Sequence, residues 1–203
     1  MDIKVNNNIA GIDVIVHHDT EDDTLRISLV EKGKKVLGKV KCGETVTIGG
    51  REYIVLDHGK DTTAIITKDF AETMVFGDNG DYRTSKVRDY CNGKFYKELA
   101  AAVGKENIVQ HTIDLTADDG TGAGITCKDY VSILTTAQYR RFRRYLPAYG
   151  KWWWTATRVN ADDKDYVRGV CYVDSSGVLD WIGSDYSCGV RPFCILNSSV
   201  SVS

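Results

Sequence analysis

The chain has 203 residues, of which 42% are hydrophobic and 27% are charged, and its formal net charge is -2. These values predict an ordinary globular protein with one good-sized domain, alone or with a small accessory segment. The near-neutral charge creates no field that favours nucleic acid or an anionic membrane, and no apolar run approaches the ~20 residues that span a bilayer. We therefore expect no nucleic-acid partner and no membrane insertion.

The first eight residues have neither the basic start nor the apolar core of a signal peptide. We therefore expect a cytoplasmic protein, unless it leaves the cell by lysis, through a dedicated secretion system or as part of a particle. The six cysteines form no Cys-x-x-Cys pair, and a chain of this length needs no disulfide framework. Reduced, mostly buried thiols are the prediction, and one bridge among Cys171, Cys188 and Cys194 remains open.

Residues 1–44 predict a small β-rich segment ahead of the main domain, which we place at 45–203. Two runs, 12–16 and 24–30, are rich in β-branched residues, and the polar span between them fits a loop from His17 to Asp23. Two strands alone are marginally stable in water, so this segment must pack on the main domain or on a neighbouring copy. Packing on a neighbouring copy would make the protein a homo-oligomer, either a dimer or a trimer.

Residues 46–67 predict three antiparallel strands in a meander. Gly49 and Gly50 separate the first two β-rich runs and provide the positive φ that a tight primed turn requires. A second turn at 58–61 leads into the third run.

A first helix is predicted to begin near Ser85, because apolar residues then recur at helical spacing as far as Val103. Gly93 is expected to break this helix into two pieces. Gly104 is expected to cap its end.

A second helix is predicted after Thr135, whose spacing from Gln138 matches a capping box, and Pro147 stops it. Its apolar face carries Tyr139, Phe142 and Leu146. Four arginines occupy the remaining surface, and we favour a solvated face over an anion-binding patch. They are Arg140, Arg141, Arg143 and Arg144.

No pattern predicts a metal or a cofactor. Residues 114–124 mix acidic residues with glycine and form a predicted loop, but their spacing is not that of the helix–loop–helix calcium motif. No hydrolase or phosphate-binding motif accompanies the four histidines, which are His17, His18, His58 and His111. We expect no cofactor and no bound metal.

Residues 151–196 predict a region that displays side chains between two core strands. It opens with three consecutive tryptophans, of which at least one must lie at an edge or beneath a loop. Residues 166–174 alternate, which predicts a strand with one buried face and one face of aromatic and charged groups, followed by a turn at 174–177. Aromatic residues give rigid contact area and short polar residues give adaptable hydrogen bonds, so this composition is typical of a binding surface.

Motifs along the chain carry a resemblance to a known family. They are the tryptophan run, a Tyr-Val...Val-Asp-x-x-Gly hairpin, the terminal Gly-Val-Arg-Pro-Phe, and the upstream Ser-x-Val-Arg...Phe-Tyr and Leu-Thr-Thr-Ala-Gln-Tyr-Arg helices. Together they resemble the C-type lectin fold in its bacterial and phage form, including the variable proteins of diversity-generating retroelements. Over residues 45–203 the resemblance implies an α+β fold: a mixed, mostly antiparallel sheet with two helices, whose last strands expose a ligand surface.

The same resemblance implies a set of ligand-binding residues, because the substituted positions of the diversified proteins lie in their C-terminal part. Carried onto this chain, they are Arg158, Asn160, Asp162, Asp163, Tyr166, Arg168, Tyr172, Asp180, Trp181, Ser184, Asp185 and Tyr186. The chain lacks the Glu-Pro-Asn, Gln-Pro-Asp and Trp-Asn-Asp motifs of sugar-binding animal lectins. We therefore expect no calcium-dependent sugar binding.

The expected function is non-enzymatic binding of a protein or glycan on a cell surface. The protein would be a phage- or bacterium-encoded receptor-binding or adhesion module, located on a virion or at the cell surface. One alternative is an enzyme of the formylglycine-generating type, which shares the broader fold and would need a reactive cysteine such as Cys188 or Cys194. The other alternative is a structural virion subunit.

Arg191 is expected to have a structural, hydrogen-bonded or paired role.

Overall fold

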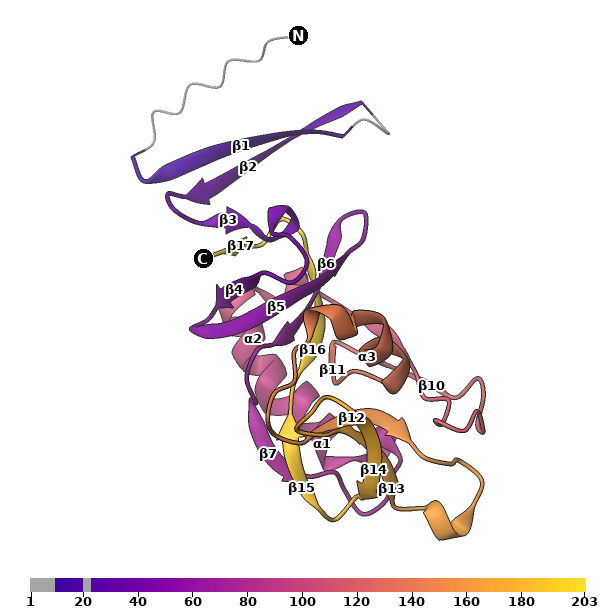
Figure 1. The fold of residues 1–203 in the computed structure, drawn as a ribbon. Helices are drawn as coiled ribbons and strands as arrows, with labels where there is room; N and C mark the ends of the chain where they lie inside the picture. The colour runs from indigo at the N-terminus through magenta and orange to yellow at the C-terminus, as the bar shows by residue number, and fades with distance from the viewer. Residues whose placement is uncertain (1–9, 20–22) are drawn as a thin grey trace.

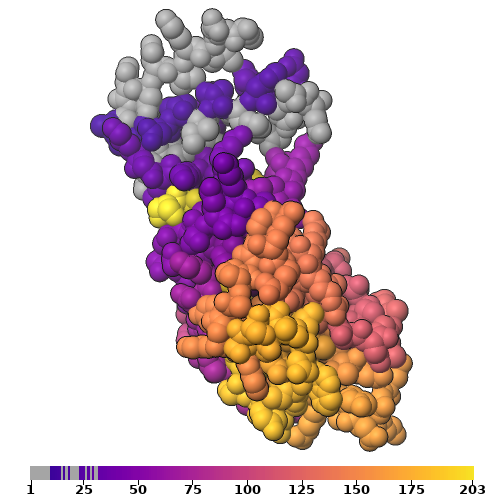
Figure 2. Space-filling view, viewed as in Figure 1, coloured from indigo at the N-terminus to yellow at the C-terminus, as the bar shows by residue number. Residues whose placement is uncertain are grey.

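The computed structural model describes residues 10–19 and 23–203 (Figure 1). In that part of the chain, two large sheets and two helices form the main body, and a long β-hairpin stands at one end. The predicted display region lies at the opposite end, where Figure 2 shows orange and yellow C-terminal segments together. The α+β class with mostly antiparallel strands is confirmed.

The first large sheet has six strands. They are β4 (Thr45–Ile48), β5 (Arg51–His58), β6 (Thr62–Thr67), β8 (Ile108–Val109), β11 (Val131–Ser132) and β16 (Phe193–Asn197). Their order is β11-β16-β6-β5-β4, with β8 also paired to β16. Gly49 and Gly50 have φ values of 57° and 78° and form the turn between β4 and β5, so the predicted meander is confirmed.

The second large sheet has five strands and carries the display region. They are β7 (Glu72–Val75), β12 (Trp153–Arg158), β13 (Gly169–Val173), β14 (Leu179–Gly183) and β15 (Ser187–Val190). In the order β14-β13-β12-β15-β7, only β12 and β15 run parallel, so this sheet is mixed. Strand β14 lies at its edge.

The first helix is continuous through three segments. These are α1 (Lys86–Tyr90), a π-helical turn (Cys91–Phe95) and α2 (Tyr96–Val103). Ser85 Oγ caps the start by accepting from the Arg88 N–H at 3.0 Å, and Gly104, with φ 83°, ends the helix as predicted. The predicted break at Gly93 is wrong, because the wider π turn includes this residue without ending the helix.

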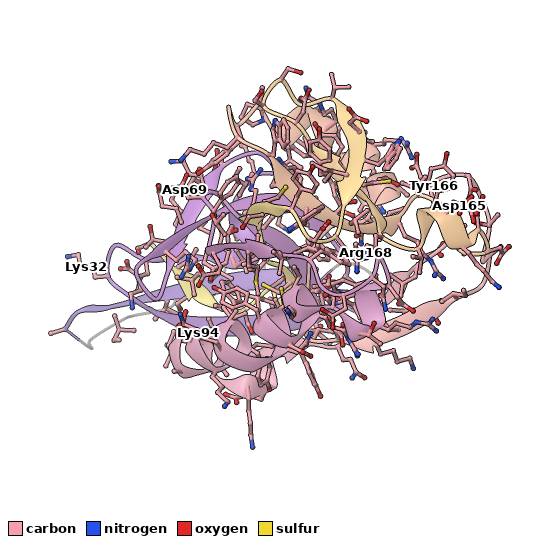
Figure 3. All side chains as sticks on the ribbon, turned by 90° about the horizontal axis from the view of Figure 1, so that it is seen from below. Lys32, Asp69, Lys94, Asp165, Tyr166 and Arg168 are labelled. Atoms are coloured by element: carbon pink, nitrogen blue, oxygen red, sulfur yellow. The ribbon has the colours of Figure 1, made fainter. Side chains whose placement is uncertain are left out.

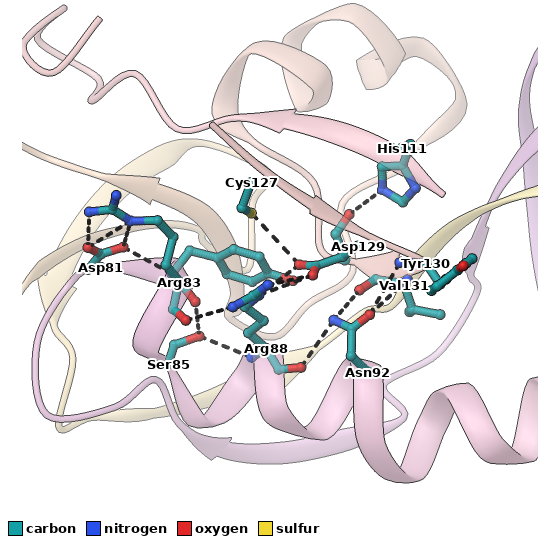
Figure 4. Close-up of polar contacts among 12 residues, drawn as sticks. Asp81, Arg83, Ser85, Arg88, Asn92, His111, Cys127, Asp129, Tyr130 and Val131 are labelled. Carbon is teal, nitrogen blue, oxygen red and sulfur yellow. Dashed lines mark hydrogen bonds and ion pairs between the residues drawn. The ribbon is translucent and has the colours of Figure 1, made fainter. Parts of the chain in front are cut away.

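Buried polar contacts fix this helix to the β-rich segment that follows it (Figure 4). The Arg88 guanidinium donates to both carboxylate oxygens of Asp129, at 2.8 to 3.1 Å, and Asp129 is only 5% exposed. One turn later, the Asn92 amide donates to the Val131 carbonyl at 2.8 Å. Two residues on one helix face therefore hold the corner that leads into β11.

The second helix, α3 (Thr136–Phe142), begins at the predicted capping box. Thr135 Oγ1 accepts from the Gln138 N–H at 3.2 Å, and the Gln138 side chain accepts from the Thr135 N–H at 3.0 Å. A 3-10 turn (Arg143–Tyr145) extends α3 and ends before Pro147. The four arginines of this segment are exposed, as expected of a solvated face.

The core divides into two clusters, one on each side of the sheets. The first helix packs Phe95 and Leu99 into one cluster with Trp154, and α3 packs Tyr139 into the other with Trp153. Successive strand residues point to opposite faces, so both faces of β12 are covered. Trp153 and Trp154 are therefore buried, and Trp152 is 45% exposed, which confirms that one tryptophan of the run lies outside the core.

Arg191 has the structural role expected of it. Only 1% of it is exposed, its Nε–H donates to the Thr67 carbonyl at 3.0 Å, and its guanidinium lies over the rings of Trp153 and Tyr149 at 5.1 and 5.4 Å. Burial lowers the pKa of this arginine to about 10. The side chain thus ties the loop after β15 to the end of β6.

Two short pairs complete the main body. Strands β9 (His111–Asp114) and β10 (Thr126–Asp129) pair with each other, and the predicted loop at 114–124 lies between them. Strands β3 (Lys35–Val36) and β17 (Ser201–Val202) also pair. Leu37 and Val40 are 0% and 3% exposed and belong to the first core cluster. Packing thus assigns residues 35–44 to the main body, whereas the sequence placed the boundary after residue 44.

The N-terminal hairpin consists of β1 (Ile12–Asp19) and β2 (Thr24–Glu31), paired over their whole length. The two predicted strands are confirmed, but the predicted loop from His17 is too long, because β1 continues to Asp19. Loop residues 20–22 lie outside the described residues. None of the helices in the described part of the chain is long and apolar enough to cross a membrane.

Candidate ligand-binding surface

The β13–β14 hairpin forms the base of the candidate surface, and its turn is set by Asp174. The Asp174 carboxylate accepts from the Ser176 hydroxyl and N–H, both at 2.7 Å, and from the Val178 N–H at 2.8 Å. The hydrogen bond from the Ser176 side chain is the main reason why the pKa of Asp174 is lowered. Gly177, with φ 85°, completes the predicted turn, and its carbonyl accepts from the Tyr139 hydroxyl at 2.7 Å.

The segment before β13 differs from the predicted strand. Residues Lys164–Tyr166 form a 3-10 turn, and the Asp163 carboxylate caps it by accepting from the Asp165 N–H at 2.8 Å. The strand begins only at Gly169, and all of its residues are buried. The predicted alternating strand from Tyr166 with one solvated face is therefore wrong, because the five-stranded sheet is covered on both faces here.

Two aromatic side chains meet over one face of the β13–β14 hairpin. Tyr166 and Trp181 lie edge to face, with ring centroids 5.5 Å apart and an interplanar angle of 72°. They are 39% and 51% exposed. Figure 3 shows Asp165 and Tyr166 together at the outer edge of the molecule. Large aromatic rings that remain half exposed are available to a ligand.

A second aromatic pair lies on the other face. Trp181 is opposite Cys171 in the β13–β14 register, so the adjacent Tyr172 points the other way. There the Tyr172 ring stacks on Trp152, with centroids 5.0 Å apart. The opposite partner of Tyr172, Asp180, is exposed. The candidate surface thus includes both faces of the edge strand β14.

One charged pair joins the segment before β13 to the segment after β14. Arg168 Nη1 lies 3.6 Å from Asp185 Oδ2, and both side chains are more than 60% exposed. Such an exposed pair is weak, so a ligand group could replace either partner at small cost. Tyr186 follows Asp185 and is 58% exposed.

The loop after β12 is held by the loop between β9 and β10. The Arg158 carbonyl accepts from the Asp118 N–H at 2.9 Å, the Asn160 amide donates to the Asp119 carboxylate, and the Ala161 N–H donates to Thr121 Oγ1 at 2.7 Å. Arg158 and Asn160 are half-buried as a result, while Asp162 and Asp163 are exposed. The described structure thus gives this loop many hydrogen bonds of its own.

Two of the twelve predicted residues are buried. Tyr172 is 5% exposed beneath Trp152, and burial raises its pKa. Ser184 is 0% exposed; its N–H donates to the Arg168 carbonyl at 2.8 Å and its own carbonyl accepts from the Phe76 N–H at 2.9 Å. Ser184 thus joins the end of β14 to the segment after β7. Both predictions of direct ligand contact are corrected, because neither side chain reaches the surface.

Three exposed apolar residues at this end were not among the predicted site residues. Trp152, Val167 and Val178 are 45%, 57% and 59% exposed. Trp152 could have been found, because one tryptophan of the run had to lie outside the core. The exposure of Val167 could not be predicted. It depends on the 3-10 turn at Lys164–Tyr166, where the alternating sequence pattern predicted a strand.

The described residues place neither a group of metal ligands nor an exposed cysteine at this surface. Among the described residues, no three His, Cys, Asp or Glu side chains are placed to hold a metal ion. All six cysteines are described and carry free thiols. Cys188 and Cys194 are buried, and burial raises the pKa of both, that of Cys188 to about 11. A reactive cysteine needs the opposite environment, which is exposed and electropositive.

A cavity of about 400 Å³ lies away from this surface, between the β4–β5 hairpin and α2. Its charged groups are already engaged within the chain. The Arg51 guanidinium lies over the Phe95 ring at 5.3 Å and 3.7 Å from Glu98, and Glu52 pairs with Lys68 at 2.9 Å. The cavity therefore offers little unpaired charge to a ligand.

No family model matches the chain, and no curated protein or solved structure matches it. Function is therefore inferred from the residues of the chain itself.

Proposed function

We propose that this protein is a non-enzymatic recognition module with a C-type lectin-like fold, which binds a protein or glycan on a cell surface. The single observation that carries the proposal is the group of exposed aromatic residues around β14: Trp152, Tyr166, Trp181 and Tyr186. Half-exposed aromatic rings cost solvation free energy in the free protein, and they are the residue type most often found at the energetic centre of interfaces.

The framework under these rings supports the same function. Strand β13 and the adjoining Trp153 and Trp154 are buried, so side chains on the outside can be exchanged without removing core volume. Exposed aromatic rings spread over two faces of an edge strand suit a macromolecular partner better than a small molecule, which usually binds in a concave site.

Binding can be tested with labelled protein on a panel of intact bacterial cells and on an array of purified bacterial glycans and surface proteins. We expect at least one target to bind, and Trp181→Ala with Tyr186→Ala to weaken that binding by about 30-fold or more. Tyr130→Ala is the matched control: Tyr130 is 40% exposed and stacks on Tyr96 at 5.3 Å, away from β14. Equal binding by the aromatic variant and the wild type would contradict the assignment.

The origin of the surface is part of the same proposal. We assign the protein to a phage or bacterium that diversifies the C-terminal segment with a retroelement, and place it on a virion or at the cell surface. The genomic neighbourhood tests this directly. A near-copy of codons 150–196 that differs at adenines, beside a reverse transcriptase gene, is the expected finding. A neighbourhood without both elements would leave a binding module of fixed sequence.

A further inference from the structure

The N-terminal hairpin carries an apolar face that the described chain does not cover. Val14 lies opposite Leu29 and Val16 opposite Ile27 in the antiparallel register, so these four side chains share one face of the two strands. Ile27 and Leu29 are 63% and 62% exposed, and Val16 and Leu25 are 38% and 47% exposed. Figure 1 shows the hairpin standing beyond the β3–β17 pair.

This face requires a permanent cover. A two-stranded hairpin is at best marginally stable alone in water, and this one is paired only with itself in the described structure. Every copy of the chain carries the same face, so a second copy is a partner that is present whenever the protein is made. The main body is not available, because its core closes with β3 and β17 below the hairpin.

The two ends of the hairpin carry opposite charge. By sequence, positions 19–23 hold four carboxylates (Asp19, Glu21, Asp22 and Asp23), whereas positions 31–35 hold Lys32, Lys34 and Lys35 with Glu31. Each strand has eight residues, so these ends are roughly 26 Å apart. That separation is about three times the Debye length of ~8 Å at physiological salt, so each end acts as a separate charged pole.

From the apolar face and the two poles we infer that the hairpin is a dimerisation element, which binds the hairpin of a second copy face to face and antiparallel. In this arrangement the end of each hairpin at Asp19 and Asp23 lies beside the lysine-bearing end of the partner, and two-fold symmetry makes that contact twice. A parallel pair, or a three-fold bundle of parallel hairpins, would bring like poles together. Charge therefore selects both the partner and the orientation.

The inference is independent of the proposed recognition function and has a separate readout. Sedimentation equilibrium of the full chain in low salt is expected to give twice the mass of one chain. Threonine is β-branched and favours strands, so Ile27→Thr with Leu29→Thr keeps a high β-propensity at both positions but removes apolar area. This double substitution should weaken dimerisation by about 100-fold or more. Val178→Thr, at an equally exposed apolar position on the opposite end, should leave the dimer unchanged.

Orientation is tested by charge. Asp23 has φ 52°, a conformation that asparagine also adopts, so Asp23→Asn removes one charge and keeps the turn. In the antiparallel dimer Asp23→Asn and added sodium chloride both weaken association; in a parallel assembly both strengthen it. A chain that stays monomeric at all concentrations, a mass of three chains, a dimer insensitive to the threonine pair, or association strengthened by salt would each overturn the inference.

Discussion

At the scale of single residues, burial decides which polar side chains hold the framework and which face a ligand. His111 is one of the buried group: its Nε2 lies 2.9 Å from Ser132 Oγ, and its ring meets Phe193 edge to face with centroids 5.3 Å apart. Burial lowers the pKa of His111 below its ordinary value of 6.5. The fold therefore favours the neutral imidazole over the charged one, compared with the unfolded chain.

We expect the free energy of unfolding to fall as the pH drops below about 6.5, because the unfolded chain then binds a proton at His111 that the folded chain resists. This contribution is fully present above pH 6.5, and its slope cannot exceed about 1.4 kcal/mol per pH unit. Urea unfolding between pH 5 and 7.5 measures how the free energy of unfolding depends on pH. His111→Gln should make that dependence weaker. An unchanged slope in that variant would contradict the assignment of this pH dependence to His111.

At the scale of elements, two arginine–aspartate pairs near the start of the first helix differ in burial and so in energetic weight. In the pair of Arg88 with Asp129, the carboxylate side chain is only 4% exposed. In the pair of Arg83 with Asp81, the arginine is 43% exposed and the aspartate 20%. Removing the cation from a buried carboxylate leaves an uncompensated charge, while an exposed pair is replaced by water.

We therefore expect Arg88→Met to lower the free energy of unfolding by about 3–5 kcal/mol, and Arg83→Met to lower it by less than about 1 kcal/mol. A third variant, Arg88→Met with Asp129→Leu, should recover much of the loss because no buried charge remains. Chemical denaturation of the three variants gives the comparison. Equal losses from the two single substitutions would show that burial of Asp129 does not control this corner.

Local signals in the sequence predicted the elements well where one short motif determines the backbone. Gly49-Gly50 and the Thr135–Gln138 capping box each specified their turn or helix start. The prediction was wrong where distant segments decide. Tyr172 alternates like a solvated residue but lies under Trp152, and Ser184 lies in a polar stretch but is enclosed by the segment after β7. The π turn at Gly93 keeps a helix intact that a helix-interior glycine predicts to break.

At the scale of the whole molecule, the β3–β17 pair makes both ends of the main body depend on each other. The Leu37 N–H donates to the Val200 carbonyl at 2.8 Å, and Leu37, Val40 and Val202 are all buried. Among the hairpin residues whose side chains are described, none belongs to either core cluster.

A chain truncated to residues 35–203 should therefore keep the unfolding free energy of the main body. A chain truncated to 45–203 should lose about 3 kcal/mol or more, because it lacks the buried Leu37 and Val40. Urea unfolding followed by circular dichroism measures the free energy of unfolding of both truncated chains under identical conditions. Equal stability would mean that the first core cluster closes without the segment between β3 and β4.

The pairing of β3 with β17 also has a mechanical consequence. Lys35, at the start of β3, lies opposite Val202, at the end of β17. These two strand ends are therefore side by side, far from β14 (Figure 1). A tether at either end holds the molecule by its base and points the aromatic rings outward, and a load on a bound ligand then passes through the whole main body. A force applied between the start of β3 and the end of β17 instead separates the two strands, breaking their hydrogen bonds one after another. An assembly that must resist force would therefore be joined through one end alone.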